Sequence, residues 1–267
     1  MSGFGIRYNG DAAFARAAQR LIPFMILLYL VSFLDRVNVG FAALSMNADV
    51  GLSATAFGWG AGIFFLGYVL FEVPSNLAME RVGARRWICR IMMTWGLASS
   101  AMVFVAGPVS FFVLRFLLGV AEAGFFPGMI LYLTYWFPAA MRARFVASFM
   151  VAVPLASAVG APISALLLGM DGLLGLKGWQ WLFLIEGLPA CLLAFAVLAY
   201  LPDSPQSASW LNAEEKALIA ERLCQETESQ SHRLSTLGAA LLDRRVLLLG
   251  LVYLGIVIGL YGIGFWL

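Results

Sequence analysis

The 267-residue sequence has little charge: only 12% of its residues are Asp, Glu, Lys or Arg, whereas 62% are hydrophobic. A soluble domain usually carries about 25% charged residues. Together with a mean hydropathy of +0.88, this deficit excludes a water-soluble globule, because too little polar surface is available to cover one of this size. A membrane protein needs no such cover, since lipid solvates its outer surface.

Cysteine and histidine are also scarce. The three cysteines, Cys89, Cys191 and Cys224, are widely spaced, and the one histidine, His232, lies in a polar stretch. This spacing indicates neither a disulfide framework nor a metal site. The sequence contains no HExxH, GxSxG or phosphate-loop motif. We therefore expect no enzymatic activity, no cofactor and no nucleic-acid partner.

Long hydrophobic runs are what the sequence has in abundance. A bilayer core about 30 Å thick requires ~20 apolar residues in a helix. The segments that meet this requirement are residues 21–43, 57–79, 87–106, 110–136, 145–169, 179–201 and 246–267. The first is too long for the apolar region of a signal peptide, and no cleavage site is obvious. We interpret it as the first membrane helix.

The spacing of these runs predicts the domain organisation of an all-α membrane protein. A cytoplasmic tail, residues 1–20, precedes a six-helix bundle, residues 21–201. Residues 202–245 form a charged linker, and residues 246–267 form a seventh membrane helix. Within the linker, Asn212-Ala213-Glu214-Glu215 is typical of a helix N-cap with an acid three residues on. That short amphipathic helix is expected either on the membrane surface or as an ordinary solvated linker helix.

Lysine and arginine predict the orientation, because cytoplasmic loops carry an excess of both. The N-terminal tail, the loops after the second and fourth helices and the 202–245 linker together hold fourteen such residues. The opposite loops hold only Lys177. We expect a multi-pass protein of the bacterial inner membrane, in contact with lipid, with its N-terminus and linker in the cytoplasm.

Several ionisable residues interrupt the apolar runs: Asp35, Arg36, Glu72, Arg115, Glu122 and Glu186. Charges within a bilayer are costly and usually face a cavity or a partner. In antiparallel helices, Asp35 and Glu122 are expected at similar depth near the midplane. Arg115 precedes Glu122 by two helical turns, so both lie on one face, ~10 Å apart along the axis.

Asp35 and Arg36 are adjacent, so their side chains diverge by roughly 100° on a helix. We expect Arg36 to face a central cavity and Asp35 to face a neighbouring helix. A guanidinium in such a cavity is a strong receptor for a carboxylate, and a carboxyl there can bind and release a proton. The alternative is that these charges only neutralise one another and hold the helices together.

Five segments resemble the major facilitator superfamily, most closely its anion:cation symporter family, which includes tartrate, hydroxyphenylacetate, phthalate and galactonate permeases. They are YLVSFLDRVNVG (29–40), FEVPSNLAMERVGARRW (71–87), RFLLGVAEAGFFPG (115–128), the segment from WQW to EGLP (179–189), and LPDSP (201–205). The resemblance covers nearly all of residues 20–267 and implies a proton-coupled symporter of a small organic anion, such as tartrate or a related hydroxy or aromatic acid.

The resemblance also implies roles for individual residues. Asp35 and Glu122 match the proton-binding carboxyls, and Arg36 matches the arginine that binds the substrate carboxylate. Arg115 matches an arginine that partners the acid of the first helix. Tyr68 matches a tyrosine near the substrate.

Two further features follow from the resemblance. Glu72, one turn beyond Tyr68, is expected either to tune substrate choice or to act as a third titrating group. Glu80, Arg81, Arg85 and Arg86 are similar to a cytoplasmic gate latch, which controls conformation and does not bind substrate.

The chain departs from the family in length. The family has two six-helix halves with the site between them, and this sequence matches the N-terminal half plus the first helix of the second. We expect the missing C-terminal half to complete the cavity, and the proton gradient to be the energy source. The alternatives are an uncoupled facilitator, an anion exchanger, or a truncated inactive fragment.

Overall fold

The computed structural model describes residues 12–230 and 243–266 of the chain. Residues 1–11 and 231–242, which include His232, lie outside the described residues. Within the described part, six helical segments are long and apolar enough to cross a membrane. These segments confirm the predicted all-α membrane fold.

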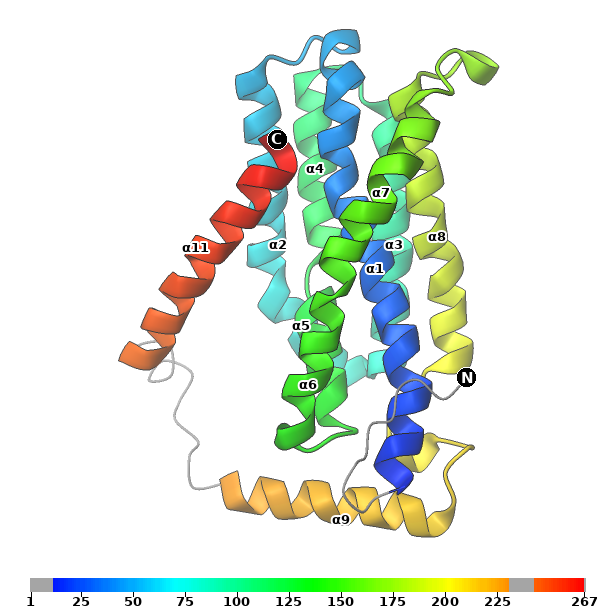
Figure 1. The fold of residues 1–267 in the computed structure, drawn as a ribbon, viewed down its shortest axis with the longest axis vertical. Helices are drawn as coiled ribbons and strands as arrows, with labels where there is room; N and C mark the ends of the chain where they lie inside the picture. The colour runs from blue at the N-terminus through cyan, green and yellow to red at the C-terminus, as the bar shows by residue number, and fades with distance from the viewer. Residues whose placement is uncertain (1–11, 231–242, 267) are drawn as a thin grey trace.

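The membrane-length segments are α1 (Ala12–Asp49), α2 (Ala54–Val82), α3 (Ala84–Ser100) with η1 (Ala101–Phe104), α4 (Pro108–Glu122) with α5 (Phe125–Thr134), α6 (Ala139–Met150) with α7 (Ala152–Leu168), and α8 (Gly178–Tyr200). The remaining elements are η2 (Leu173–Gly175), η3 (Pro205–Ser207), α9 (Ala213–Gln230) and α11 (Arg244–Trp266). Figure 1 shows the long helices side by side in a bundle, with α11 inclined against one flank. That flank contact is made with α1.

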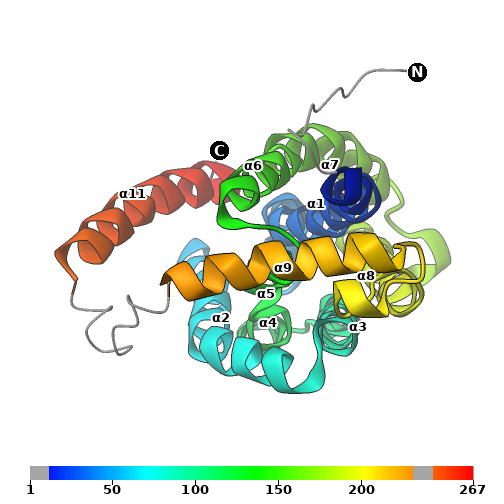
Figure 2. The ribbon, with the colours of Figure 1, turned by 90° about the horizontal axis from the view of Figure 1, so that it is seen from below.

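We call the end of the bundle that carries α9 the basic end. It holds the start of α1, the α2–α3 turn and the α5–α6 turn, and α9 runs across it (Figures 1 and 2). It also carries most of the arginines outside the core, including Arg81, Arg85 and Arg86. The opposite end carries the α1–α2 and α7–α8 turns.

Two spans predicted as continuous helices are interrupted, and a proline explains each break. Proline lacks an amide hydrogen, and its ring collides with the carbonyl four residues earlier. Pro127 disturbs the helix at Ala123, where α4 gives way to α5, and the next residue, Gly124, adopts a left-handed φ of 83°. Pro154 similarly follows the end of α6 at Met150. The break at Ala123 therefore falls immediately after Glu122.

The helix ends differ from the predicted ones because helices continue beyond the apolar runs. The first helix was predicted to begin at residue 21, yet α1 begins at Ala12. Its first turns bury Phe14, Ala17 and Ala18 in the main hydrophobic core. An amphipathic face that packs on the protein suffices to extend the helix there.

Helices α2 and α4 approach closely through glycine. A Cβ atom on Gly119 would lie 2.0 Å from the carbonyl oxygen of Phe64, and one on Gly67 would lie 2.6 Å from that of Phe116. Small residues allow such backbone contact between membrane helices. Gly62, by contrast, faces open space. The close contact places Phe64 and Tyr68 of α2 against α4.

Helix α9 packs on the bundle. Its N-terminus has the predicted capping box, in which Asn212 Oδ1 accepts from the Glu215 amide at 2.8 Å and Glu215 accepts from the Asn212 amide at 3.0 Å. Ile219 is fully buried. Ion pairs with Arg16 of α1, at 2.9 Å from Glu215, and with Arg142 of α6, at 2.6 Å from Glu226, hold its two ends. The helix therefore belongs to the basic end, and its placement on the membrane surface or as an ordinary solvated linker helix stays a prediction.

The α2–α4 contact predicts that Gly119→Ala destabilises the protein, because the added methyl group meets backbone that cannot yield. Overpacking of this kind costs about 1–3 kcal/mol. We expect a melting temperature several degrees lower in detergent. Gly62→Ala is the matched control and should melt at or above the temperature of the unaltered protein, since alanine favours helix where space is open. Equal melting temperatures for the two variants would contradict the close contact.

Candidate functional site

The centre of the site is an ion pair between α1 and α4. Arg36 Nη2 contacts Glu122 Oε1, and Ser32 donates a hydrogen bond to the same oxygen at 3.0 Å. The Glu122 side chain is 1% exposed and that of Arg36 is 12% exposed. Of the two partners, only Arg36 is therefore open to an approaching ligand.

Aromatic rings of α2 cover the Arg36 guanidinium. Its carbon lies 5.3 Å from the ring centre of Tyr68 and 5.7 Å from that of Phe64. Cations are attracted to the faces of such rings. Glu72, one turn after Tyr68, is half-buried and lies within electrostatic range of Arg36. The structure thus brings Tyr68 and Glu72 beside Arg36, while their roles in substrate binding stay predictions.

Asp35 is buried on another side of α1, at 1% exposure. It accepts hydrogen bonds from Trp95 Nε1 at 2.7 Å, from the Ser99 hydroxyl, and from the Asn38 amide at 3.2 Å. Trp95 and Ser99 are one turn apart on α3. The two adjacent side chains diverge as expected: Asp35 points to α3, and Arg36 points to α2 and α4.

Arg115 is fully buried, at 1% exposure. Its Nε donates to the Gly60 carbonyl at 3.4 Å, and its guanidinium lies 4.7 Å from the ring centre of Phe64. The Phe64 ring therefore lies beside the guanidinium groups of both Arg36 and Arg115. Arg115 is also within electrostatic range of Asp35. The predicted role of Arg115 as the charge partner of Asp35 stays a prediction.

Glu186 of α8 extends this polar region toward α7. It is 8% exposed, and its Oε1 accepts from the Ser164 hydroxyl at 3.1 Å. Asp35 lies within electrostatic range of it. In the part of the chain that the structure describes, no group of three or more His, Cys, Asp or Glu side chains is placed to hold a metal ion.

The predicted gate residues lie at the basic end, away from Arg36. Arg81 is in the last turn of α2, and Arg85 and Arg86 are in the first turn of α3. The amide of Arg85 donates to Asp203 Oδ1 at 2.9 Å. Glu80 is in the last turn of α2. The site and the predicted gate are therefore separate regions.

Apart from Tyr68, sequence reasoning missed the uncharged members of the site. Ser32 is one turn before Arg36, and this spacing places both on one face of α1. Trp95 and Ser99 have the same four-residue spacing on α3. Phe64 carried no distinguishing signal, because an aromatic residue in an apolar run is ordinarily part of the core.

Comparison with known proteins finds a matching family model and several named relatives. The family model described as "Major Facilitator Superfamily" matches residues 25–267. A protein of Agrobacterium vitis named "Putative tartrate transporter" is 56% identical over 247 residues, which are 92% of this chain and 57% of that protein. The "Quinolone resistance transporter" of Acinetobacter baumannii is 49% identical over 93% of this chain and 57% of its own length.

A third relative, the "Inner membrane transport protein RhmT" of Escherichia coli, is 43% identical over 96% of this chain and 59% of its own length. The chain thus spans less than two thirds of the curated relatives it matches. Solved structures agree in fold at low identity. The xylose transporter XylE of E. coli in an inward-open conformation has a TM-score of 0.63 and 18% identity, over 83% of this chain and 58% of XylE.

A bacterial homologue of the human lysosomal transporter Spinster, in an inward-facing and occupied conformation, also has a TM-score of 0.63, with 20% identity. That match covers 73% of this chain and 46% of the homologue. The two solved structures therefore agree with the predicted fold.

The buried ion pair predicts a strong coupling between two substitutions. Removal of one partner leaves an uncompensated buried charge and typically costs about 3–5 kcal/mol, whereas replacement of both by apolar residues is often close to neutral. We expect Arg36→Met and Glu122→Leu each to lower the melting temperature strongly. The double variant should be more stable than the sum of the single effects predicts. Additive losses in thermal unfolding would show that the pair makes no net interaction.

Proposed function

This chain belongs to the Major Facilitator Superfamily, and from that premise we propose that it carries a small organic anion across the bacterial inner membrane together with protons. The observation that carries the proposal is the buried Arg36–Glu122 pair. It joins a group suited to bind a carboxylate with a group suited to carry a proton.

The coupling follows from charge balance. A buried guanidinium needs one negative partner, and two carboxylates at the same place repel each other. When a substrate carboxylate binds Arg36, Glu122 no longer has a full counter-charge and takes up a proton. When the substrate leaves, Glu122 releases the proton and pairs with Arg36 again. Anion and proton therefore travel together.

Asp35 is the second proton-binding carboxyl in this proposal. The Ser99 hydroxyl that donates to it can rotate and accept instead, whereas the Trp95 indole can only donate. Asp35 therefore has one partner that serves both protonation states and one that favours the charged state. Its position between α1 and α3 allows a proton to change how these helices pack, which is what alternating access requires.

Named relatives support a carboxylate as the substrate class, because one is named for tartrate. A guanidinium flanked by Tyr68, and by Glu72 within electrostatic range, suits a carboxylate that also carries hydroxyl groups. Glu72 then tunes substrate choice. The other wall of the cavity is the C-terminal half, of which α11 is the first helix.

Orientation is the last part of the proposal. Excess arginine and lysine at the basic end favours a cytoplasmic location for the N-terminus and α9. Glu80, Arg81, Arg85 and Arg86 then form a cytoplasmic gate. An uncoupled facilitator, an anion exchanger and an inactive fragment are the competing outcomes of the transport experiment.

The experiment is uptake of labelled tartrate and other carboxylates into proteoliposomes with an inward proton gradient. The chain is compared with a form completed by the C-terminal half of the Agrobacterium vitis relative. We expect the completed form to accumulate substrate, and a protonophore to abolish accumulation. Arg36→Ala should lower uptake by about 100-fold or more, because it removes a buried charged contact. Glu122→Gln should abolish accumulation and leave downhill exchange.

Glu72→Gln is the matched control: it should change the preference among carboxylates and retain proton-driven accumulation. If folded protein accumulates no carboxylate under a proton gradient, the proposal is wrong. If accumulation survives the protonophore, an uncoupled or exchange mechanism replaces symport. Activity of the short chain by itself would mean that it assembles a working cavity without the second half.

A further inference from the structure

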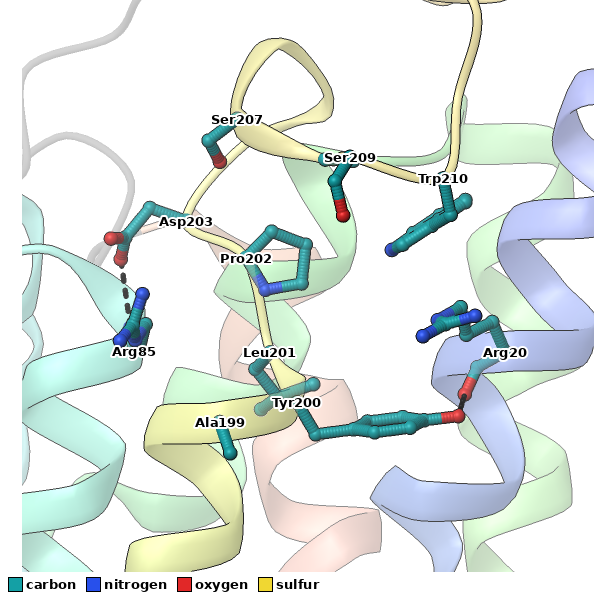
Figure 3. A pocket seen from close by; sticks show the side chains of 11 residues that line it. Arg20, Arg85, Ala199, Tyr200, Leu201, Pro202, Asp203, Ser207, Ser209 and Trp210 are labelled. Carbon is teal, nitrogen blue, oxygen red and sulfur yellow. Dashed lines mark hydrogen bonds between the residues drawn. The ribbon is translucent and has the colours of Figure 1, made fainter.

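A cavity of about 230 Å³ lies at the basic end, far from Arg36 and Glu122. It is bounded by α1, by the start of α3, by the end of α8 and by residues 201–210 (Figure 3). Of its lining residues, only Arg85 has a part in the proposed transport cycle, as a member of the gate. Its lining is mainly polar.

Two guanidinium groups line this cavity from opposite sides, Arg20 of α1 and Arg85 of α3 (Figure 3). The Arg20 guanidinium lies between two aromatic rings, 5.2 Å from the centre of Tyr200 and 5.6 Å from that of Trp210. The Tyr200 hydroxyl donates to the Arg20 carbonyl at 3.1 Å. These contacts hold the cation at the cavity. Among residues 12–230 and 243–266, neither guanidinium makes an ion pair.

The carboxylate of Asp203 also lines the cavity, but its negative charge is offset at the N-terminus of α3. Its Oδ1 accepts the hydrogen bond from the Arg85 amide at 2.9 Å and so caps the N-terminus of α3. The positive end of a helix dipole offsets a carboxylate in this position. The cavity keeps an excess of positive charge, and the Ser209 hydroxyl points into it (Figure 3). Its chemistry fits an anion with several oxygen atoms.

The position of the cavity relative to the membrane indicates which class of anion it binds. The apolar span of α8 ends at Tyr200, and the apolar run of α1 begins at Leu21. Tyrosine and tryptophan at such ends mark the level of the lipid headgroups. The cavity is therefore at the depth at which phospholipid phosphates lie.

An exposed apolar stripe on α8 leads directly to the cavity. Leu188, Leu192 and Phe195 are 46%, 70% and 62% exposed. Their spacing of three to four residues continues to Ala199, which lines the cavity. An acyl chain that packs along this stripe would bring its headgroup to Arg20.

We propose that this cavity binds the phosphate of a phospholipid headgroup, with Arg20, Arg85 and Ser209 as its ligands and the acyl chains along α8. The shared chemistry is a phosphoryl anion, and the stripe on α8 favours a lipid over free phosphate. The lipid would bridge α1, α3 and α8 at the basic end. The site is separate from Arg36, so its test does not depend on transport.

Native mass spectrometry of delipidated protein in detergent tests the proposal, with dioleoyl phosphatidylglycerol titrated as the probe. Arg20→Gln should weaken lipid binding by about tenfold, the size expected for loss of one charge-assisted contact. Arg144→Gln is the matched control, because it removes the same charge at the same end. Arg144 is exposed on α6 and does not line the cavity. It should bind lipid as the unaltered protein does.

Three outcomes would overturn the proposal. Equal lipid affinity in Arg20→Gln and Arg144→Gln would show only general charge attraction. Equal binding of dioleoylglycerol, which has no phosphate, would show that the headgroup is not recognised. Displacement of the lipid by millimolar inorganic phosphate would assign the cavity to a soluble anion. Arg20→Lys keeps the charge and should retain most of the binding, which separates loss of the site from misfolding.

Discussion

The site is organised around the charge of Arg36, which lies inside an apolar bundle with little access to solvent and must be balanced. Glu122 supplies the counter-charge from α4, and Ser32 of α1 satisfies the same carboxyl oxygen. Because an unbalanced buried charge is far more costly than a surface one, α1 and α4 are held at a fixed depth relative to each other. In the proposed cycle, an anion that replaces Glu122 at Arg36 therefore changes the protonation of Glu122.

The helices around this pair are shaped to make it possible. Close contacts at glycine bring α2 against α4. The Phe64 ring therefore lies beside the guanidinium groups of both Arg36 and Arg115. The break after Glu122, caused by Pro127, ends α4 at the carboxyl itself. A helix interrupted beside a functional residue can move its two parts separately. The proposed change of charge at Glu122 thus takes place next to a break in the helix.

Sequence predicted the fold well and the site only in part. Apolar run lengths located the six spans, because a bilayer imposes length directly, but breaks such as that before Pro127 depend on how a helix accommodates a proline. The divergence of Asp35 and Arg36 followed from helical geometry alone. The partners of Asp35 did not, since Trp95 and Ser99 reach it only through the packing of α3 on α1. The packing of α9 across the basic end also depends on tertiary contacts, which a single sequence does not reveal.

The most direct test of this account is the proton stoichiometry of substrate binding. The completed protein is mixed with a binding carboxylate in weakly buffered detergent solution, and the pH change is recorded at several starting pH values. If the substrate carboxylate replaces Glu122 as the partner of Arg36, about one proton is taken up per anion bound, and Glu122→Gln binds the anion without this uptake. Binding without proton uptake by the unaltered protein, or identical uptake by Glu122→Gln, would contradict it.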